Sequence, residues 1–442
     1  MFRFIPLLIL FLILGCSFDN KTGIWENSNS PKNIKKKDRF EDFKKLYTEE
    51  ESFNKIIAPP KDLKILSGKI KKNSNWSDEF YANSNNYENF SYNNLNKVIF
   101  RSKKLTKYEI NERILFDGKR VIINDEKGNI VIYSVDEKKI IYKYNFYKKR
   151  FKKLKKQLNI VVESDFIYVI DNIGYFYKLN FIKNKLVWAK NFKTPFRSNI
   201  KIHENKILAA DLNNKLYILD KFSGNRLRII PTENSSLKNE FKNSLALSGD
   251  SIFFLNTYGS LYSVNSNNQK IQWFNNFNQS LDLNSGNLFY SNPIVTYKNK
   301  VLVSTDPYFY TLDLTSGLML SKTSITSVVK PIISEGGIFL ITKDNLLVYK
   351  QLNSEKVIYS INIDQEIAKF LSTKKKSISV QSLFIVNNDL FVFLDNSYLI
   401  KFNKKGKIKS IDKLPAKIGT YPIFISSSIL YLNKKNQLVI LD

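Results

Sequence analysis

An internal repeat is the sequence feature that most constrains the fold of this chain. An apolar segment that contains an aromatic residue and ends in Asp or Asn recurs most clearly as Leu216–Asp220, Leu261–Asn265 and Phe309–Asp313. Less strict copies centre on Tyr133, Tyr177, Val348, Ile400 and Val439. The eight centres lie about 44 residues apart, and each unit contains four short apolar segments separated by turns. Units of this length with four short strands are typical of β-propeller blades.

A turn residue also recurs at a nearly constant distance before each repeat centre. Each unit has a turn residue 11 to 15 positions before its centre. These residues are Gly118, Asp165, Asn205, Gly249, Asn299, Gly336, Asn388 and Ser427. Gly, Asn, Asp and Ser favour tight turns, and the first three tolerate the positive φ angles that hairpins need. The constant offset predicts a hairpin between the first two strands of every unit.

The last unit, from Pro422 to Asp442, has room for only three strands. The segment Val98–Leu105 lies upstream of the first unit and reads as an unassigned fourth strand. Pairing it with the last unit would close the ring and remove two exposed sheet edges. The sequence therefore predicts an all-β fold, an eight-bladed β-propeller of four-stranded antiparallel blades over residues 97–442. A β-sandwich uses fewer strands than eight such units provide, although irregular spacing near Lys369–Val380 leaves the blade count open.

The N-terminus predicts export and lipidation. One positive charge precedes the apolar run Ile5–Leu14, which is too short to span a bilayer and is typical of a signal peptide. Ile13–Cys16 is similar to the bacterial lipobox, and Cys16 is the single cysteine of the chain. Residues 1–16 are thus predicted to be a lipoprotein signal peptide with the lipid attached to Cys16. The alternative is an ordinary signal peptide with a coincidental cysteine. Ser17 is similar to the residue found after the cysteine in lipoproteins sent to the outer membrane.

Residues 17–60 are polar and rich in turn formers, which predicts a tether. Within it, Phe40, Phe43 and Tyr47 recur at helical spacing, so the piece from Asp38 to Phe53 is either a docking helix or a tether with nascent helix. Residues 61–96 are expected to lead into the propeller.

The repeat carries a family resemblance. Tyr217–Asp220 and Tyr310–Asp313 are each followed by a glycine four residues later, and Trp188 and Trp273 supply a downstream aromatic residue. This pattern is similar to the pyrroloquinoline-quinone-type propeller repeat. Together with the lipobox and tether it resembles the BamB family, lipoproteins of the machinery that inserts β-barrels into the outer membrane. The resemblance implies a non-catalytic scaffold that uses no cofactor and faces the periplasm. It also implies two partners: the barrel-forming central subunit, BamA, and unfolded barrel precursors.

In that family, the loop after the third blade binds the central subunit. The matching positions here are Leu237, Lys238 and Glu240, although Asn239 and Ser235 depart from the family pattern. Lys238 keeps a positive charge but lacks the planar donor fork of arginine.

The loop after the fourth blade is the next longest, and the resemblance places Asp282 and Leu283 on the same partner surface. The alternative for both loops is a surface connection without a partner.

Residue counts exclude several enzyme classes. With one Cys and one His, the chain can form neither an intrachain disulfide nor a Cys/His zinc site. A quinone-dependent dehydrogenase is the alternative within the fold class, but the adjacent cysteine pair of such enzymes is missing. The run Asp282–Gly286 lacks the glutamate that completes a calcium loop. His203 stands beside a predicted turn, and no nucleophile motif, Walker motif or dinucleotide fingerprint occurs.

The formal net charge is +29. The densest basic runs are residues 148–156, 374–376 and 401–409. They indicate either binding of anionic envelope polymers or lipid head groups, or a compositional bias, since the chain is rich in Lys, Asn, Ile, Phe and Tyr throughout. Nucleic acid is not an expected partner outside the cytoplasm.

Overall fold

The computed structural model describes residues 16–18, 25–27, 53–234, 241–278, 289–352 and 356–442. The chain divides into two compact units, Met1–Glu51 and Ser52–Asp442. In the first, strands β1 (Cys16–Phe18) and β2 (Trp25–Asn27) pair antiparallel with Cys16 opposite Asn27. The helix predicted over residues 38–53 lies outside the described residues, apart from Phe53. Within the described part of the chain, no helix is long and apolar enough to cross a membrane.

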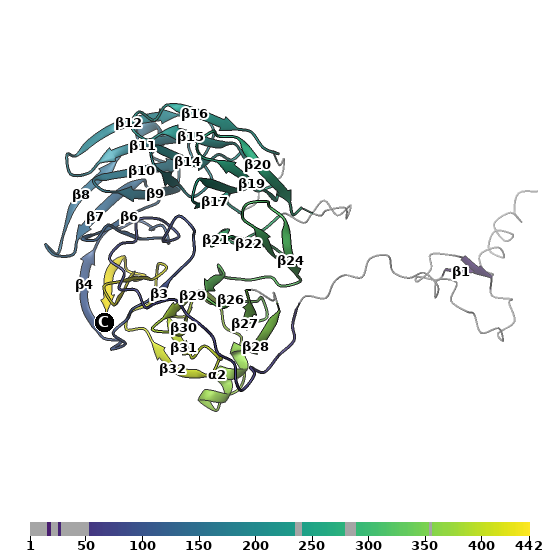
Figure 1. The fold of residues 1–442 in the computed structure, drawn as a ribbon. Helices are drawn as coiled ribbons and strands as arrows, with labels where there is room; N and C mark the ends of the chain where they lie inside the picture. Colours follow the sequence, from purple (N-terminus) through teal and green to yellow (C-terminus); the bar gives the residue numbers. More distant parts are fainter. Residues whose placement is uncertain (1–15, 19–24, 28–52, 235–240, 279–288, 353–355) are drawn as a thin grey trace, which may run out of the picture. The chain divides into compact units, whose positions relative to one another are not determined.

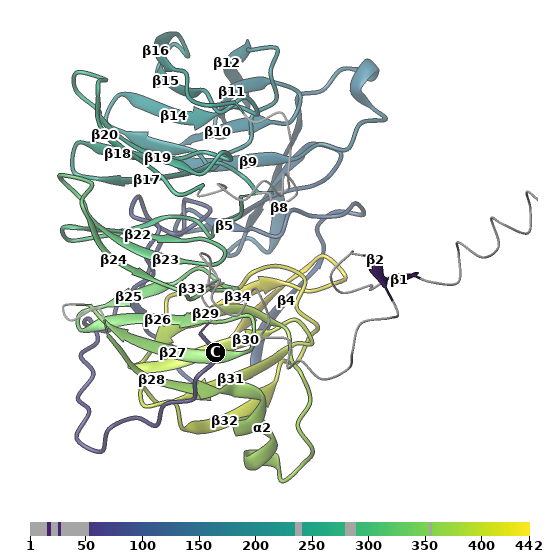
Figure 2. The same ribbon diagram turned by 90° about the vertical axis from the view of Figure 1, so that its right-hand side faces the viewer.

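The second unit is a ring of eight sheets, here called blades 1 to 8 in chain order (Figure 1). Each has four antiparallel strands, and Figure 2 shows those of blade 6 side by side. Blade 1 comprises β5 (Leu115–Phe116), β6 (Arg120–Asn124), β7 (Asn129–Ser134) and β8 (Lys139–Asn145). Blade 2 comprises β9 (Leu158–Glu163), β10 (Phe166–Asp171), β11 (Tyr175–Asn180) and β12 (Lys185–Asn191). Blade 3 comprises β13 (Lys201–His203), β14 (Lys206–Ala210), β15 (Leu216–Asp220) and β16 (Arg226–Ile230), and blade 4 comprises β17 (Ser244–Ser248), β18 (Ser251–Leu255), β19 (Ser260–Asn265) and β20 (Ile271–Asn276). Blade 5 comprises β21 (Val295–Tyr297), β22 (Lys300–Ser304), β23 (Phe309–Asp313) and β24 (Met319–Thr323). Blade 6 comprises β25 (Ile332–Ser334), β26 (Gly337–Ile341), β27 (Leu346–Gln351) and β28 (Val357–Asn362). Blade 7 comprises β29 (Val380–Val386), β30 (Asp389–Leu394), β31 (Tyr398–Phe402) and β32 (Ile408–Lys413).

Blade 8 joins the two ends of the propeller. It contains β33 (Ile423–Ile425), β34 (Ser428–Leu432) and β35 (Gln437–Leu441), and its fourth strand is β4 (Val98–Lys104). β4 pairs antiparallel with β35, with Arg101 opposite Val439. The predicted eight-bladed fold and its closure by an N-terminal strand are therefore confirmed.

Every repeat centre falls on the third strand of a blade, and every predicted turn residue lies between the first two strands. The irregular stretch between blades 6 and 7 contains α2 (Ile363–Leu371), a nine-residue helix. Asn362 caps it, because its side chain accepts a hydrogen bond from the Gln365 amide. A short 3-10 helix, η1 (Lys149–Phe151), precedes blade 2.

The core lies between the faces of neighbouring blades. The second strands are almost continuously apolar and buried, as in β18, because a propeller sheet is covered on both faces. The fourth strands alternate in exposure, as in β20. Trp188 and Trp273 lie on fourth strands, and each packs on a glycine of the following blade, Gly224 and Gly317.

Residues 73–93 lie inside the ring, close to its axis, and are called the axial segment below. The segment contains β3 (Asn89–Phe90), which pairs parallel with β29 inside the ring (Figure 1). Trp76, Tyr81, Tyr87 and Phe90 form an aromatic cluster in it with ring centroids 4.8 to 6.5 Å apart. This cluster fills the axis with apolar side chains at one end.

The axial segment hydrogen-bonds to the blades in their chain order. Its contacts with blades 1 to 8 are Trp76 with Phe116, Ser77 with Val162, Asp78 with Lys201, Asn83 with Leu247, Ser84 with Thr296, Asn86 with Ile333, Phe90 with Asn387, and Asn93 with Ser427. The blade residues lie in or just after each blade's innermost strand. Asn73, which precedes Trp76, also bonds to blade 8 through Phe424 and Ser426. The segment thus makes one turn around the axis.

Candidate functional site

A cavity of about 290 Å³ lies at the axis, between the axial segment and the segments that lead into the innermost strands. Its walls come from the segments that lead into the innermost strands, and its floor comes from Glu79, Phe80 and Tyr87 of the axial segment. The wall residues are Asn111, Glu112, Arg113, Asn199, Phe241, Lys242, Asn243, Ser244, Tyr290, Ser291, Asn292, Pro293, Val328, Val329, Lys330, Gln381, Ser382, Leu383 and Tyr421. The axial segment therefore turns the central channel into a pocket.

A buried ion pair ties the floor to blade 3. Lys201 is fully buried, and its Nζ lies 2.7 Å from Asp78 Oδ2 and 2.8 Å from the Ala82 carbonyl oxygen. Burial lowers the pKa of Lys201, although Asp78 acts against this change. The pair neutralises two charges that would otherwise be costly to bury.

Two further cations, Arg113 and Lys330, line the cavity. The guanidinium of Arg113 lies 3.5 Å from the ring centroid of Tyr421, and Lys330 Nζ lies 3.3 Å from that of Tyr87. Neither cation forms an ion pair within the described parts of the chain. Burial lowers the pKa of Lys330 well below its usual range, and the charges of Arg113 and Lys201 add to this effect.

The predicted partner residues Leu237, Lys238, Glu240, Asp282 and Leu283 all lie outside the described residues, in segments 235–240 and 279–288. The residues that follow these segments are described. The ring centroid of Phe241 lies 5.5 Å from that of Phe289 and 6.3 Å from that of Tyr290. Phe241 and Tyr290 also line the axial cavity. The residues that directly follow the two segments thus lie close together, and Phe241 and Tyr290 place them beside the axial cavity.

Glu233 fixes the other end of the first loop. Its carboxylate accepts hydrogen bonds from Tyr262 at 2.7 Å, Asn256 at 3.1 Å and Ser260 at 3.1 Å. Burial acts to raise the pKa of Glu233, but these bonds outweigh it and the pKa is lowered. The sequence analysis missed this residue because its partners lie in the next blade, beyond the reach of any local pattern.

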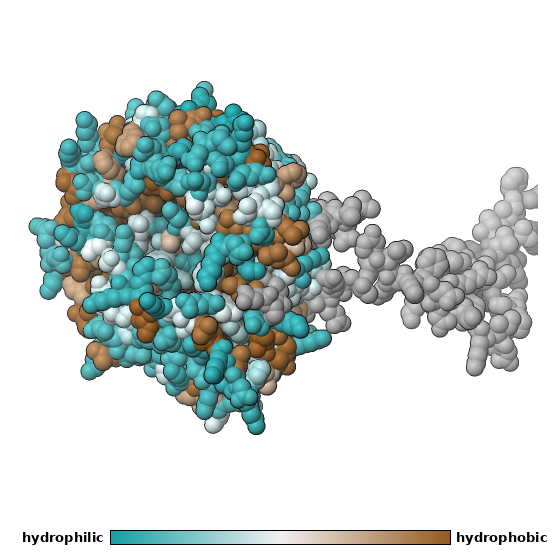
Figure 3. All heavy atoms as spheres, viewed as in Figure 1, coloured by the Kyte–Doolittle hydropathy of each residue, from teal (hydrophilic) through white to brown (hydrophobic). Residues whose placement is uncertain are grey.

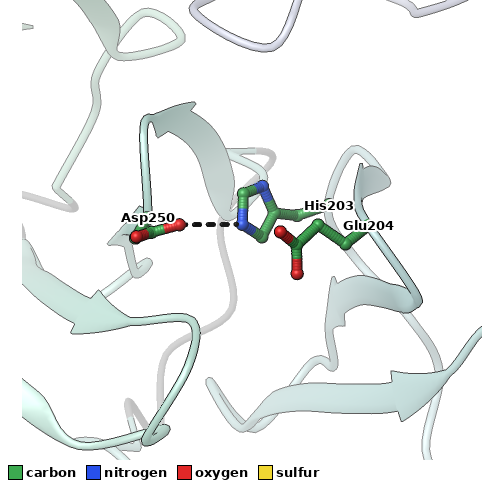
Figure 4. Close-up of side chains that lie close together, drawn as sticks. All are labelled: His203, Glu204 and Asp250. Carbon is green, nitrogen blue, oxygen red and sulfur yellow. Dashed lines mark ion pairs between the residues drawn. The ribbon is translucent and has the colours of Figure 1, made fainter.

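His203 lies at a hairpin turn, as predicted, and not in the cavity. Its ring points toward Asp250 of the neighbouring blade, with the Nε2 atom 3.5 Å from Asp250 Oδ1, and Glu204 lies beside both (Figure 4). Within the described residues, this is the one group of His, Cys, Asp or Glu side chains close enough to share a metal ion. Both carboxylates are exposed, so the arrangement resembles an ordinary surface ion pair.

The basic run 148–156 forms an exposed loop between blades 1 and 2. Lys155 pairs with Glu109 at 2.6 Å, and Lys156 is buried and donates to the Phe151 carbonyl. The other basic residues of the loop are exposed. On the face drawn in Figure 3, hydrophilic residues predominate and apolar residues occur in separate groups.

The fold and the cavity define the class: an eight-bladed propeller with PQQ-type repeats, closed by its own N-terminal strand and with a cavity on its axis. The family model described as outer membrane protein assembly factor BamB matches residues 101–358, more than half of the chain. The chain therefore belongs to the BamB family. A search of curated proteins found no match.

Solved structures share the fold at low identity. BamB from Moraxella catarrhalis has a TM-score of 0.61 and 12% identity, covering 78% of this chain and 99% of its own. Quinohemoprotein alcohol dehydrogenase from Comamonas testosteroni has a TM-score of 0.62 and 8% identity, covering 84% and 81%. A europium-containing methanol dehydrogenase has a TM-score of 0.58 and 10% identity, covering 83% and 89%. At these identities the likeness shows the propeller fold alone.

Proposed function

We propose that this protein is a non-catalytic scaffold of outer-membrane β-barrel assembly that binds the barrel-forming central subunit. The family match over residues 101–358 carries the proposal. The docking surface is assigned to the loops after blades 3 and 4, with Leu237, Lys238, Glu240, Asp282 and Leu283 as contact residues. The contact of Phe241 with Phe289 and Tyr290 supports a shared surface for these loops.

The proposal includes the location of the protein. A lipid on Cys16 would hold it on the outer membrane with the propeller in the periplasm. There, the exposed fourth strands of the blades offer edges to unfolded barrel precursors by β-augmentation.

The donor set of the cavity does not fit a metal-dependent quinone cofactor. The carboxylates that line it, Glu79 and Glu112, do not belong to any group of described residues close enough to share a metal ion. The sequence has one cysteine, at position 16, and so no adjacent cysteine pair. These observations favour the scaffold over the dehydrogenases that share its fold.

The test is a crosslinked pull-down from cell envelopes with the wild type and with Leu237→Asp plus Lys238→Glu. Lys153→Glu plus Leu154→Asp is the matched control, since it makes the same chemical changes at exposed residues of another interblade loop. We expect the wild type and the control to recover the barrel-forming subunit, and the loop variant to lose it. Equal recovery by all three would place the docking site elsewhere. No recovery by any of them would overturn the scaffold role.

A further inference from the structure

The axial cavity has a polar lining in which basic side chains outnumber carboxylates. Arg113, Lys242 and Lys330 contribute three basic groups, and Glu79 and Glu112 contribute two carboxylates. Among the described residues, none of these five side chains pairs with another of the set. A site with this lining is suited to a ligand that brings its own negative charge.

Arg113 forms no ion pair among the described residues, although Glu79 and Glu112 lie near enough to act to raise its pKa. Its guanidinium packs on Tyr421 and lies 5.3 Å from the ring centroid of Phe80. Stacking on aromatic faces holds the planar group but leaves its N–H donors, which lie in the plane, for another acceptor. Carboxylates and phosphates match these donors in a bidentate arrangement.

Lys330 enters the same cavity from the loop before blade 6. Its Nζ donates to the Asn85 carbonyl oxygen and lies over Tyr87. The charged groups that act on it are Arg113 from the loop before blade 1, Lys201 from blade 3 and Asp78 from the axial segment. Since Asp78 is already bound by Lys201 at 2.7 Å, Lys330 has two cations and an engaged carboxylate as neighbours.

Unpartnered polar atoms lie on the wall nearby. Ser382 is 5% exposed, and neither its hydroxyl nor the buried Gln381 Oε1 has a hydrogen-bond partner. Both residues line the cavity. Buried polar groups of native proteins are nearly always hydrogen-bonded, so an unpartnered hydroxyl on a cavity wall indicates a ligand or bound water.

We propose that the axial cavity binds a small organic anion whose carboxylate or phosphate group lies between Arg113 and Lys330, with the Ser382 hydroxyl as a further donor. The volume of about 290 Å³ is enough for a small organic anion. Tyr87, Tyr290 and Tyr421 provide aromatic surface for its uncharged part. This inference is independent of the partner-binding loops.

Binding would couple to protonation. An anion beside Lys330 favours its charged form and opposes the effects of burial, Arg113 and Lys201. Protons are therefore taken up from solution when the ligand binds at a pH between the lowered pKa of Lys330 and the usual pKa of lysine. Lys330→Met should lose this uptake if Lys330 is its source.

The experiment uses the chain from residue 16 with Cys16→Ser, which prevents lipidation. Succinate and inorganic phosphate are titrated separately at constant ionic strength set with chloride, and heat is measured in two buffers of different ionisation enthalpy. We expect saturable binding of at least one anion with proton uptake. The two titrations distinguish a carboxylate ligand from a phosphate ligand. Arg113→Gln and Lys330→Met are expected to weaken binding at least tenfold.

Lys374→Met is the matched control because Lys374 is exposed and does not line the cavity. The proposal is overturned if the wild type binds neither anion, or if the cavity variants bind as tightly as the control. If one cavity variant fails to fold, the other variant and the wild-type titration still decide, since a wild type that binds neither anion overturns the proposal.

Discussion

The indole ring of Trp273 in blade 4 covers Gly317 in blade 5 so closely that a Cβ atom built on Gly317 would lie 2.5 Å from Trp273 Cδ2. Gly317 also has a φ of +72°, and Trp273 Nε1 donates to the Leu314 carbonyl oxygen at 3.2 Å. One contact therefore fixes the outer strand of one blade against the last turn of the next. Trp188 and Gly224 repeat it between blades 2 and 3.

Gly317→Ala is therefore expected to destabilise the propeller by roughly 2–4 kcal/mol, because it adds both backbone strain and steric overlap. Gly249→Ala separates these two effects. Gly249 has a φ of +51° but open space around its Cβ position, so only strain remains, about 1 kcal/mol. Chemical denaturation of both variants measures the difference. Equal losses would show that Trp273 yields to the methyl group at little cost.

The buried pair of Lys201 and Asp78 predicts a strong coupling. Removing either partner leaves the other buried and unpaired, so Lys201→Met and Asp78→Asn are each expected to cost about 3 kcal/mol or more. The double variant should lose clearly less than the two single losses added together. A double-mutant cycle on the free energy of unfolding tests this expectation. Strictly additive losses would mean that the pair contributes no interaction energy.

The lowered pKa of Lys330 predicts how the free energy of unfolding depends on pH. Its pKa is lowered in the folded protein from the usual 10.5, so the unfolded chain holds more protons than the folded one between the two values. The free energy of unfolding therefore rises with pH in the range below 10.5. We expect Lys330→Met to show a smaller rise than the wild type between about pH 7 and about pH 9.5, before the tyrosines titrate. Identical slopes for the two proteins would contradict this.

Ring closure predicts how the protein responds to N-terminal truncation. A chain that begins at Ser52 keeps the axial segment and β4, so its propeller should melt at the same temperature as the full chain. A chain that begins at Thr106 lacks both and exposes the edge of β35. We expect it to aggregate, because an unpaired strand edge recruits other chains. Size-exclusion chromatography and thermal unfolding compare the two, and a soluble, cooperatively melting shorter chain would refute the expectation.

The sequence predicted the blades well because each is a local unit with its own alternation of strands and turns. It placed Tyr133 and Val439 on third strands and Val98 in the last blade, and all three placements are confirmed. Turn geometry was harder to predict in detail. Positive φ occurs at Glu204 and Lys298, one residue before the predicted Asn205 and Asn299.

The cavity could not be read from the sequence. The side chain of Asn85 donates to the carbonyl oxygens of Leu245 and Ile294, 160 and 209 residues away. Arg113 and Lys330 meet only because the ring brings blades 1 and 6 to one axis. No periodicity in residues 73–93 signals these contacts, since the segment follows the symmetry of the ring and not a symmetry of its own.

The single turn of the axial segment has a consequence for the size of the ring. Its bonds run from Trp76, which pairs with Phe116 of blade 1, to Asn93, which bonds to Ser427 of blade 8, and the blades between them are met in chain order. A ring of seven blades would leave one attachment without a blade, and a ring of nine would leave one blade without an attachment. The length of the segment is thus matched to a ring of eight blades. Duplication or loss of a blade during evolution would require a matching change in the stretch that precedes the repeats.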